Sequence, residues 1–222
     1  MTRSLLGVAA LVVGAAIVAA PPARADITGE LTVANANLAT QGAGPYASYD
    51  ISGVGGGTTF TQFEVTVTGE NGFVFGDHFI VDLNVSSGAG TIALFSSSIS
   101  PFSFGGSGNV DGFGTFSATF DDGPGFSSGG YSTITFDFTT TNALSLPNLL
   151  ITNSKGASVA GHLALATNTA CTGFAANGGS SSSPNDDPID CTAQHNVPEP
   201  STLALLGAGL LGLAMAARRR KA

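Results

Sequence analysis

The sequence predicts an all-β protein with a single antiparallel β-sandwich or jelly-roll domain, an N-terminal signal peptide and one C-terminal transmembrane helix. Three observations predict it. Short segments of alternating apolar and polar residues are separated by glycine-rich breaks, segments with a helical period occur only near the two ends, and each end has an apolar run. We expect the β domain to span residues 26–168.

The N-terminus has the features of a secretory signal peptide. Arg3 precedes an apolar run over residues 5–20, and the small residues Ala23 and Ala25 follow it in an Ala-x-Ala arrangement. This order predicts that residues 1–25 are removed by cleavage after Ala25. An uncleaved signal anchor is the alternative, which the short run and the Ala-x-Ala site disfavour.

The region between the two ends is strongly acidic. Of the basic residues only Lys155 lies within residues 26–197, together with fourteen of the fifteen acidic residues, so the formal net charge of this region is −13. Such a charge repels phosphate backbones, and we expect no nucleic-acid partner. A divalent cation, a neutral glycan or solubility alone could account for the charge.

Eight segments are expected to be strands because their apolar residues recur at every second position. In residues 60–68, for example, Phe63, Val65 and Val67 fall on one face. In residues 79–85, Phe79 is expected on the buried face and Asp82 on the opposite face. The eight segments are residues 27–34, 60–68, 79–85, 91–97, 113–120, 131–139, 144–152 and 157–167.

Glycine-rich breaks separate these segments at residues 53–57, 105–108, 121–125 and 127–130. Glycine supplies the positive φ angles that tight reversals require. Pro147 indicates that residues 144–152 form an edge strand or two shorter pieces. A parallel β-solenoid is the structural alternative, but the sequence lacks the fixed period of a solenoid.

Cys171 and Cys191 are the only two cysteines. In an oxidising compartment such a pair favours a disulfide over two free thiols. It would close a 21-residue loop and stabilise the fold by about 3 kcal/mol in the chain-entropy model. The Ser-, Gly- and Asp-rich residues 169–196 are therefore expected to form a disulfide-closed loop or linker.

Patterns that predict catalysis are weak, and we expect neither an enzyme nor a cofactor. His78, His162 and His195 are scattered and form no His-Glu-x-x-His pair, and residues 105–109 fail the Gly-x-Ser-x-Gly pattern at their last position. A secreted hydrolase would need two convergent carboxylates, which sequence alone does not reveal. The acids that could supply such a pair are Asp77, Asp82, Asp121 and Asp137.

Two other kinds of motif occur in the sequence. Oxygen-rich turns at residues 109–112, 121–123 and 185–190 could bind calcium, but none completes a calcium loop, and Asp and Asn favour turns for local reasons. Residues 207–212 satisfy the Gly-x-Gly-x-x-Gly pattern of dinucleotide-binding proteins. They lie inside an apolar run without a preceding strand, so small residues along a membrane helix are the better explanation.

The C-terminus predicts a membrane-spanning helix at residues 201–217. These 17 residues would extend about 25 Å, which is at the short limit for a hydrocarbon core about 30 Å thick. The stop-transfer residues Arg218, Arg219, Arg220 and Lys221 should stay on the cytoplasmic side and leave the acidic domain outside. A buried core helix is the alternative, which the four adjacent cations disfavour.

Val197, Pro198, Glu199 and Pro200, followed by this helix and the basic cluster, resemble a PEP-CTERM sorting signal over residues 197–222. The resemblance implies export through the inner membrane and processing by an exosortase-type enzyme, with the protein then anchored or released at the cell surface or matrix. Extracellular polysaccharide would be a further partner. Pro198, Glu199 and Pro200 would be the recognised element.

Two further labels attach to this resemblance. The same tail is also described as an ice-binding protein C-terminal domain, although no regular Thr-x-Thr ladder supports ice binding here. Residues 75–79, with Phe75, Asp77 and Phe79, are similar to the Phe-x-Asp-x-Phe motif of one subgroup.

The resemblance implies no active site, and three functional classes stay open. They are a non-enzymatic surface or matrix protein, a glycan-binding or adhesive module, and a secreted hydrolase. The first is favoured. The second would need exposed aromatic side chains, and the chain has no tryptophan and only the tyrosines Tyr46, Tyr49 and Tyr131.

Overall fold

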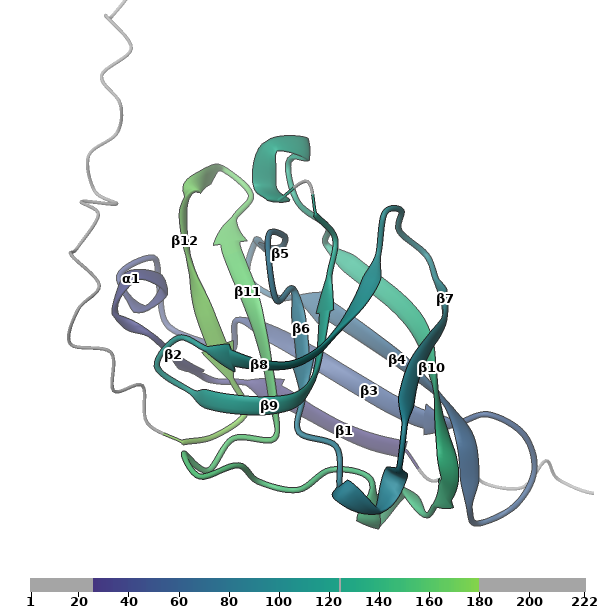
Figure 1. Ribbon diagram of the computed structural model, residues 1–222. Coiled ribbons are helices and arrows are strands. Elements are labelled where there is room, and N and C mark those ends of the chain that lie inside the picture. The colour runs from purple at the N-terminus through teal and green to yellow at the C-terminus, as the bar shows by residue number, and fades with distance from the viewer. Residues whose placement is uncertain (1–25, 124, 180–222) are drawn as a thin grey trace, which may run out of the picture.

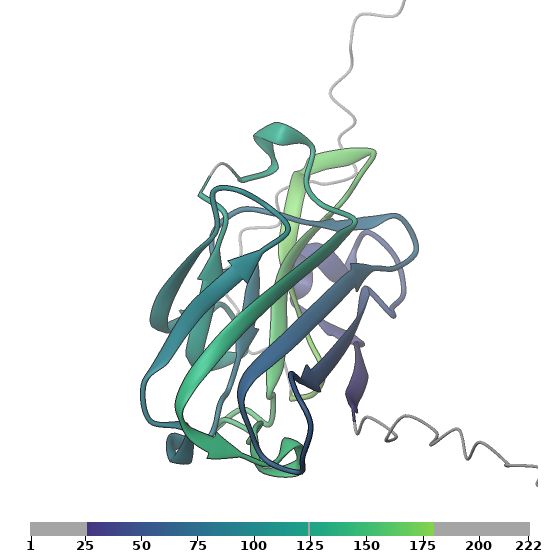
Figure 2. The same ribbon diagram turned by 90° about the vertical axis from the view of Figure 1, so that its right-hand side faces the viewer.

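The computed structural model describes residues 26–123 and 125–179, which fold into two antiparallel β-sheets packed face to face (Figures 1 and 2). Helical structure in this part of the chain is limited to one four-residue helix and three short 3₁₀ turns. The expectation of an all-β, antiparallel domain is therefore confirmed.

The first sheet has five strands in the order β1-β3-β4-β10-β7. Each neighbouring pair is antiparallel. The strands are β1 (Asp26–Leu31), β3 (Ala47–Gly53), β4 (Phe60–Gly69), β10 (Thr133–Leu144) and β7 (Ile92–Ser97). We call it the five-stranded sheet.

The second sheet has seven strands in the order β2-β12-β11-β6-β9-β8, with β5 also paired to β11. Its strands are β2 (Val33–Ala34), β5 (Phe73–Phe75), β6 (Val81–Leu83), β8 (Ser103–Val110), β9 (Gly114–Asp121), β11 (Val159–Leu165) and β12 (Asn168–Ala176). The chain passes repeatedly between the sheets, so strands that are distant in sequence become neighbours.

The main core lies between the sheets and is rich in phenylalanine. Phe120 from the seven-stranded sheet contacts Phe136 and Phe138 from the five-stranded sheet, with ring centroids 4.5 and 6.1 Å apart. Phe63 stacks on Phe138 at 5.3 Å. These side chains are fully buried, and they come from the inward positions that the alternating pattern predicts for β4 and β10.

A short helix closes the sandwich beside β12. Helix α1 (Ala36–Ala39) is capped by Asn35, whose side chain accepts a hydrogen bond from the Leu38 backbone N–H. Leu38 is fully buried in the main core. Gly173 on β12 allows this approach, because a Cβ atom there would clash with Asn35 and Leu38.

The outer face of the seven-stranded sheet is also covered. A second apolar cluster combines Val110, Phe113 and Phe116 near the β8–β9 turn with alanines of β11 and β12, among them Ala160 and Ala176. Figure 1 shows β8 and β9 running across in front of β11 and β12. Residues that point away from the main core of this sheet are therefore not automatically exposed.

Several expected strands differ from the observed ones. Residues 27–34 divide into β1 and β2, which belong to different sheets. Residues 144–152 are not a strand: β10 ends at Leu144, and a 3₁₀ turn at Leu146–Asn148 follows. Pro147 at the start of that turn lacks the N–H that a strand ladder requires.

Phe79 and Asp82 also depart from the expected pattern. Phe79 has a left-handed backbone (φ 55°) and precedes β6, which begins only at Val81. Asp82 lies on the outer face, as the alternation predicts, yet it is fully buried. The glycine-rich residues 105–108, expected as a break, lie inside strand β8.

Strand β12 lies almost entirely within residues 169–196, which were expected to form a loop or linker. It pairs with β11 and β2, so the folded region continues to at least Ala176. Cys171 lies in this strand and is buried. Cys191 lies outside the described residues, so the disulfide stays a prediction.

Candidate functional site

The outer face of the five-stranded sheet is polar. Its side chains form three rows across β1, β3, β4 and β10, because directly paired residues of antiparallel strands point to the same side. We call these rows the polar face. They are Asp26-Ser52-Glu64-Asp137, Thr28-Asp50-Thr66-Thr135 and Glu30-Ser48-Thr68-Thr133.

Hydrogen bonds link neighbouring strands across this face. The hydroxyl groups of Thr66 and Thr135 lie 3.0 Å apart. Asp137 accepts hydrogen bonds from the Gln62 amide at 3.2 Å and from the Ser96 hydroxyl at 3.1 Å. The arrangement holds the polar side chains in a regular array on a rigid sheet, where they can present several oxygen atoms to one ligand.

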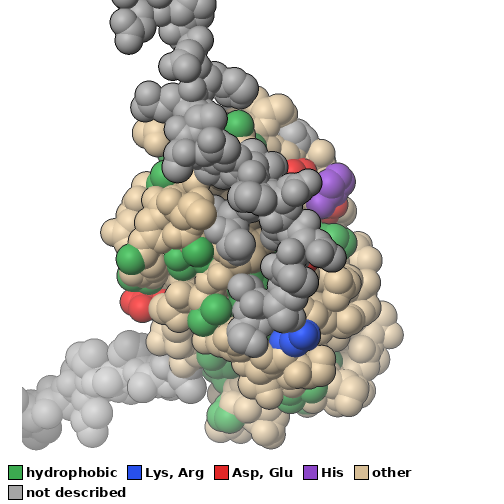
Figure 3. Space-filling view, turned by 90° about the vertical axis from the view of Figure 1, so that its left-hand side faces the viewer, with side chains coloured by type: hydrophobic (Ala, Val, Ile, Leu, Met, Phe, Trp, Pro, Cys, Tyr) green, Lys and Arg blue, Asp and Glu red, His purple; other side chains and the backbone are tan. Residues whose placement is uncertain are grey.

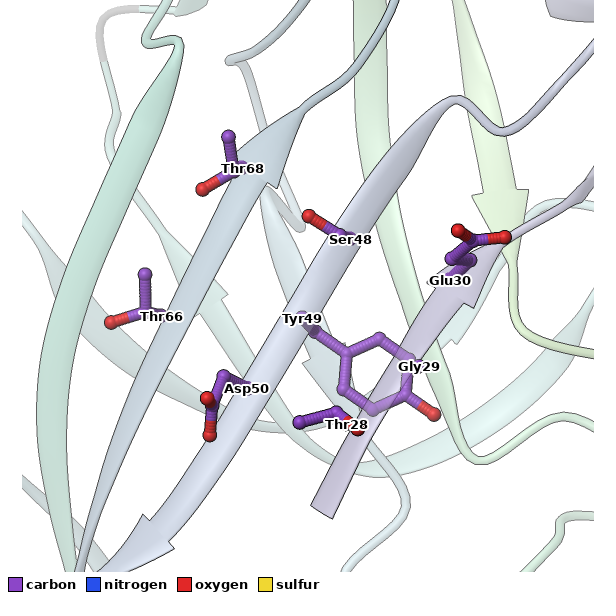
Figure 4. A pocket seen from close by; sticks show the side chains of 8 residues that line it. All are labelled: Thr28, Gly29, Glu30, Ser48, Tyr49, Asp50, Thr66 and Thr68. Atoms are coloured by element: carbon purple, nitrogen blue, oxygen red, sulfur yellow. The ribbon is translucent and has the colours of Figure 1, made fainter. Parts of the chain in front are cut away.

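Two adjoining hollows lie on the polar face. The first is lined by Thr28, Gly29, Glu30, Ser48, Tyr49, Asp50, Thr66 and Thr68, and Figure 4 shows these residues on three neighbouring strands. The second is lined by Asp26, Asp50, Ser52, Glu64 and Thr66. Both are open, and they share Asp50 and Thr66, so together they form one continuous polar depression.

Five carboxylates lie on the polar face: Asp26, Glu30, Asp50, Glu64 and Asp137. Glu64 and Asp137 are directly opposite each other in the β4–β10 ladder. The only Lys or Arg among residues 26–179 is Lys155, whose side chain lies beside Gly114 at the turn between β8 and β9, on the other sheet. The polar face therefore has no basic side chain of its own.

A second group of polar residues lies at the loop between β5 and β6, where the Phe-x-Asp-x-Phe segment is located. Asp77 and Phe79 both have left-handed backbones, with φ angles of 67° and 55°. His78 between them contacts Asp121 at the end of β9, with 2.8 Å between Nδ1 and Oδ2. The hydrogen bond to Asp121 and its charge raise the pKa of His78.

Asp82 and His162 are buried on the outer face of the seven-stranded sheet. Both carboxylate oxygens of Asp82 and the Nδ1 atom of His162 have no hydrogen-bond partner among the described residues. Burial raises the pKa of Asp82 well above its usual range, and the charge of Asp121 adds to the effect. Burial lowers the pKa of His162 to about 4, so this imidazole is neutral at pH 7.

Aromatic side chains enclose His162. Its ring stacks on Phe174 with a centroid distance of 4.3 Å and meets Phe126 edge-on at 5.5 Å. The nearby Asp122 is also fully buried, which raises its pKa, while a hydrogen bond from the Gly125 backbone opposes the rise. These residues form part of the packing of the fold, whereas the neighbouring His78 is exposed.

The acids considered for hydrolysis do not form one site. Asp82 and Asp121 lie on the seven-stranded sheet, and Asp77 lies on the adjacent loop, but Asp82 is fully buried. Asp137 belongs to the polar face of the other sheet. Within the described parts of the chain, no three His, Cys, Asp or Glu side chains are placed so that they could hold a metal ion.

The calcium candidates divide in the same way. Residues 109–112 comprise the last two residues of β8 and the first two of the turn before β9. Asp121 accepts hydrogen bonds from His78 and from the Gly123 backbone. The third candidate, residues 185–190, lies outside the described residues, as does His195.

Tyrosine side chains do not form an exposed stacking platform. Tyr46 and Tyr49 are 4 % and 8 % exposed, and Tyr131 packs against the core. Phe95 at 65 % and Ile151 at 47 % are the large hydrophobic side chains most exposed in the described part of the chain. Where the described residues are visible in Figure 3, hydrophobic groups form small separate patches.

The sorting and processing residues predicted from the sequence lie outside residues 26–179. They comprise the cleavage-site alanines, the Pro-Glu-Pro element and the basic cluster, together with the expected helix at 201–217. Among the residues that are described, no helix has the length and apolarity needed to cross a membrane.

Sequence reasoning missed the polar face and the pairing of His78 with Asp121. The alternation in β4 and β10 indicated which side chains point outward, and this signal could have found half of the face. The segment that forms β3 was not recognised as a strand, so the rows could not be assembled. Asp121 is 43 residues from His78, and a local pattern does not predict such a contact.

Comparison with known proteins identifies the C-terminal motif. A family model described as the PEP-CTERM protein-sorting motif matches residues 196–221. This confirms the resemblance seen in the sequence and indicates an exported protein that is sorted at the membrane by exosortase. No curated protein and no solved structure matched the chain.

Proposed function

We propose that this chain is a non-enzymatic protein of the cell surface or extracellular matrix, delivered there by its C-terminal sorting motif. The match to the PEP-CTERM motif at residues 196–221 carries the proposal. The motif accounts for the destination of the protein, and the β-sandwich is the domain that is delivered there. The signal-peptide features at residues 1–25 and the acidic charge of the exported region support the same destination.

The tail acts in three steps under this proposal. The apolar residues 201–217 hold the chain in the inner membrane, and the basic residues after them keep the C-terminus in the cytoplasm. Pro198, Glu199 and Pro200 then present the site that an exosortase-type enzyme recognises. Processing separates the acidic domain from the helix and leaves it anchored or released at the surface.

A structural rather than catalytic role fits the placement of the acids. Asp82 is enclosed by protein, and Asp137 lies on a different sheet from Asp121. Catalysis by a pair of carboxylates needs both groups within reach of one substrate bond. Asp121 instead pairs with His78, Asp82 is buried in the fold, and Asp137 lies on the polar face.

Intact-mass measurement of the protein from the envelope and the medium tests the proposal. We expect the mature chain to begin near Asp26 and to lack the residues after about Val197. Replacing Pro198, Glu199 and Pro200 with alanine should leave the tail attached and the protein in the inner membrane. Replacing Pro184 and Pro188, which lie before the motif, with alanine is the matched control and should leave processing unchanged. Mature surface protein that still contains Arg220 would overturn the proposal.

A further inference from the structure

We propose that the polar face binds an extended, hydroxyl-rich polymer that carries positive charges, of the chemical class of a polysaccharide of amino sugars. The inference depends on the proposed function in one respect: the proposed location at the cell surface is where the protein would encounter such a polymer. Binding itself depends on the described residues. The two can therefore be tested separately.

Unbalanced negative charge is the first argument. Glu64 and Asp137 lie directly opposite each other on neighbouring strands, an arrangement in which like charges destabilise a sheet. Asp137 receives hydrogen bonds only from the neutral groups of Gln62 and Ser96 among the described residues. A cationic ligand that binds across this pair would relieve the repulsion and would stabilise the folded state on which it depends.

Ser52 supplies an independent observation. Its side chain is on the polar face between Asp26 and Glu64, and it lines the second hollow. The residue is only 6 % exposed, and its hydroxyl group has no hydrogen-bond partner among the described residues. The hydroxyl group is not one of the fully buried atoms without a partner, so it reaches the hollow, where a ligand with its own donors and acceptors would form a hydrogen bond with it.

The spacing of the acids favours an extended ligand over a single metal ion. Neighbouring strands are about 4.8 Å apart, so the side chains of Asp26 and Glu64, two strands apart, start about 10 Å from each other. Glu30 lies four residues along β1 from Asp26, or about 13 Å. No three acids in the described part of the chain converge on one point, and only a ligand with several separated charges can meet them together.

The lining of the depression favours a polysaccharide over a peptide. Threonine, serine and carboxylate side chains make up nearly all of it, with Gly29 and Tyr49 at one side. Tight peptide sites generally bury aromatic or aliphatic anchors in apolar pockets, and neither Phe95 nor Ile151 lines the hollows. Hydroxyl and ammonium groups of an amino-sugar chain would instead match the alternating hydroxyl and carboxylate groups.

Binding of the full-length chain, purified in a non-ionic detergent, to immobilised glucosamine oligomers tests the proposal. N-acetylated oligomers, dextran, alginate and polylysine are the comparison ligands. We expect binding to the glucosamine oligomers, weaker binding to the neutral ligands and none to alginate. Affinity should fall as salt is raised from 50 to 500 mM, because exposed charges are screened.

Variants on and off the polar face locate the interaction. Glu64→Gln and Glu30→Gln should each weaken binding roughly two- to fivefold, and Ser52→Ala should also weaken it. Asp111→Asn, which removes an exposed acid at the β8–β9 turn, is the matched control and should leave binding unchanged. Melting temperatures of all variants establish that each one is folded.

Three results would overturn the inference. Equal affinity for acetylated and deacetylated oligomers would remove the role of charge. Equal weakening by Asp111→Asn would show attraction to the whole acidic chain, and polylysine binding with the same sensitivity to Ser52→Ala would remove the role of hydroxyl groups. Each result is independent of tail processing, which the intact-mass measurement reports.

Discussion

Asp82 on β6 lies directly opposite Thr119 on β9, and both side chains are buried on the outer face of the seven-stranded sheet. The Thr119 hydroxyl donates to the Gly106 carbonyl at 3.1 Å, whereas the Asp82 carboxyl group has no partner in the described part of the chain. A buried polar group without a partner costs about 1–3 kcal/mol. Asp82 is therefore a site where the fold is not at its maximum stability.

We predict that Asp82→Asn is more stable than the unchanged protein at neutral pH. The pKa of Asp82 is raised by burial, so the stability associated with its neutral form is fully present below pH 4 and is lost as the pH rises through the folded pKa. The two proteins should therefore have similar stability near pH 4, and the variant should gain roughly 1–3 kcal/mol by pH 8.

Urea unfolding at several pH values measures this difference. Asp111→Asn is the control, because Asp111 is exposed at a turn and its replacement should shift stability very little at any pH. A stability difference for Asp82→Asn that stays constant from pH 4 to pH 8 would contradict the prediction.

His162 should give the opposite pH dependence. Burial lowers its pKa to about 4, so the unfolded chain binds a proton between pH 6.5 and 4 that the folded chain does not. Stability therefore falls as the pH falls through this range, by roughly 3 kcal/mol in total. His162→Gln, which cannot be protonated, should remove this part of the pH dependence.

His78→Gln provides a comparison of opposite sign. Asp121 raises the pKa of His78 through a hydrogen bond and its charge, so the contribution of this exposed pair is present below pH 6.5 and is lost as the pH rises through the folded pKa. Unfolding of both variants from pH 4 to pH 8 separates the two histidines. An unchanged slope in His162→Gln between pH 4 and 6.5 would show that His162 is protonated in the folded state.

The predicted disulfide is tested by Cys191→Ser. Cys171 is buried in β12, so a disulfide to Cys191 would link the residues that follow β12 to the seven-stranded sheet. In the chain-entropy model the 21-residue loop is worth about 3 kcal/mol. We expect the variant to melt earlier than the unchanged protein under oxidising conditions and to match it after reduction. Equal melting under both conditions would show that the cysteines do not pair.

The sequence predicted the strands in which apolar residues on one face alternate with polar residues on the other. In β4 and β10 every second residue is buried, including Phe63, Val65, Ile134 and Phe136. Strand β8 was missed because glycines interrupt its pattern. Those glycines fit close contacts, since a Cβ atom at Gly108 would meet the side chains of Thr119 and Phe79.

The candidate sites were harder to predict, because alternation gives the face of a residue but not what covers that face. Asp82 was expected on the solvent side, but it is fully buried on the outer face of the sheet beside the buried Thr119. The polar face needed the pairing of four strands, one of which was not recognised. Contacts such as His78 with Asp121 depend on the topology, which local periodicity does not contain.

Gly29 and Gly56 form a matched pair for testing how the edge of the five-stranded sheet is packed. Tyr49 lies over Gly29, and a Cβ atom at Gly29 would clash with its ring and hydroxyl group. The Tyr49 hydroxyl accepts a hydrogen bond from the Asn177 amide at 3.0 Å, which holds the ring in place. Gly56 has no heavy atom within 4 Å of such a Cβ position.

Gly29→Ala should therefore lower the free energy of unfolding by about 1–3 kcal/mol, as overpacking does elsewhere. Gly56→Ala should leave it unchanged or raise it by up to about 1 kcal/mol, because alanine restricts the unfolded chain. Thermal unfolding of the two variants gives the comparison. Equal effects of the two substitutions would contradict this prediction, because they would mean that the Tyr49 ring moves freely away from β1. In that case, adding Tyr49→Phe, which removes the hydrogen bond to Asn177 but keeps the ring, would restore little stability to Gly29→Ala.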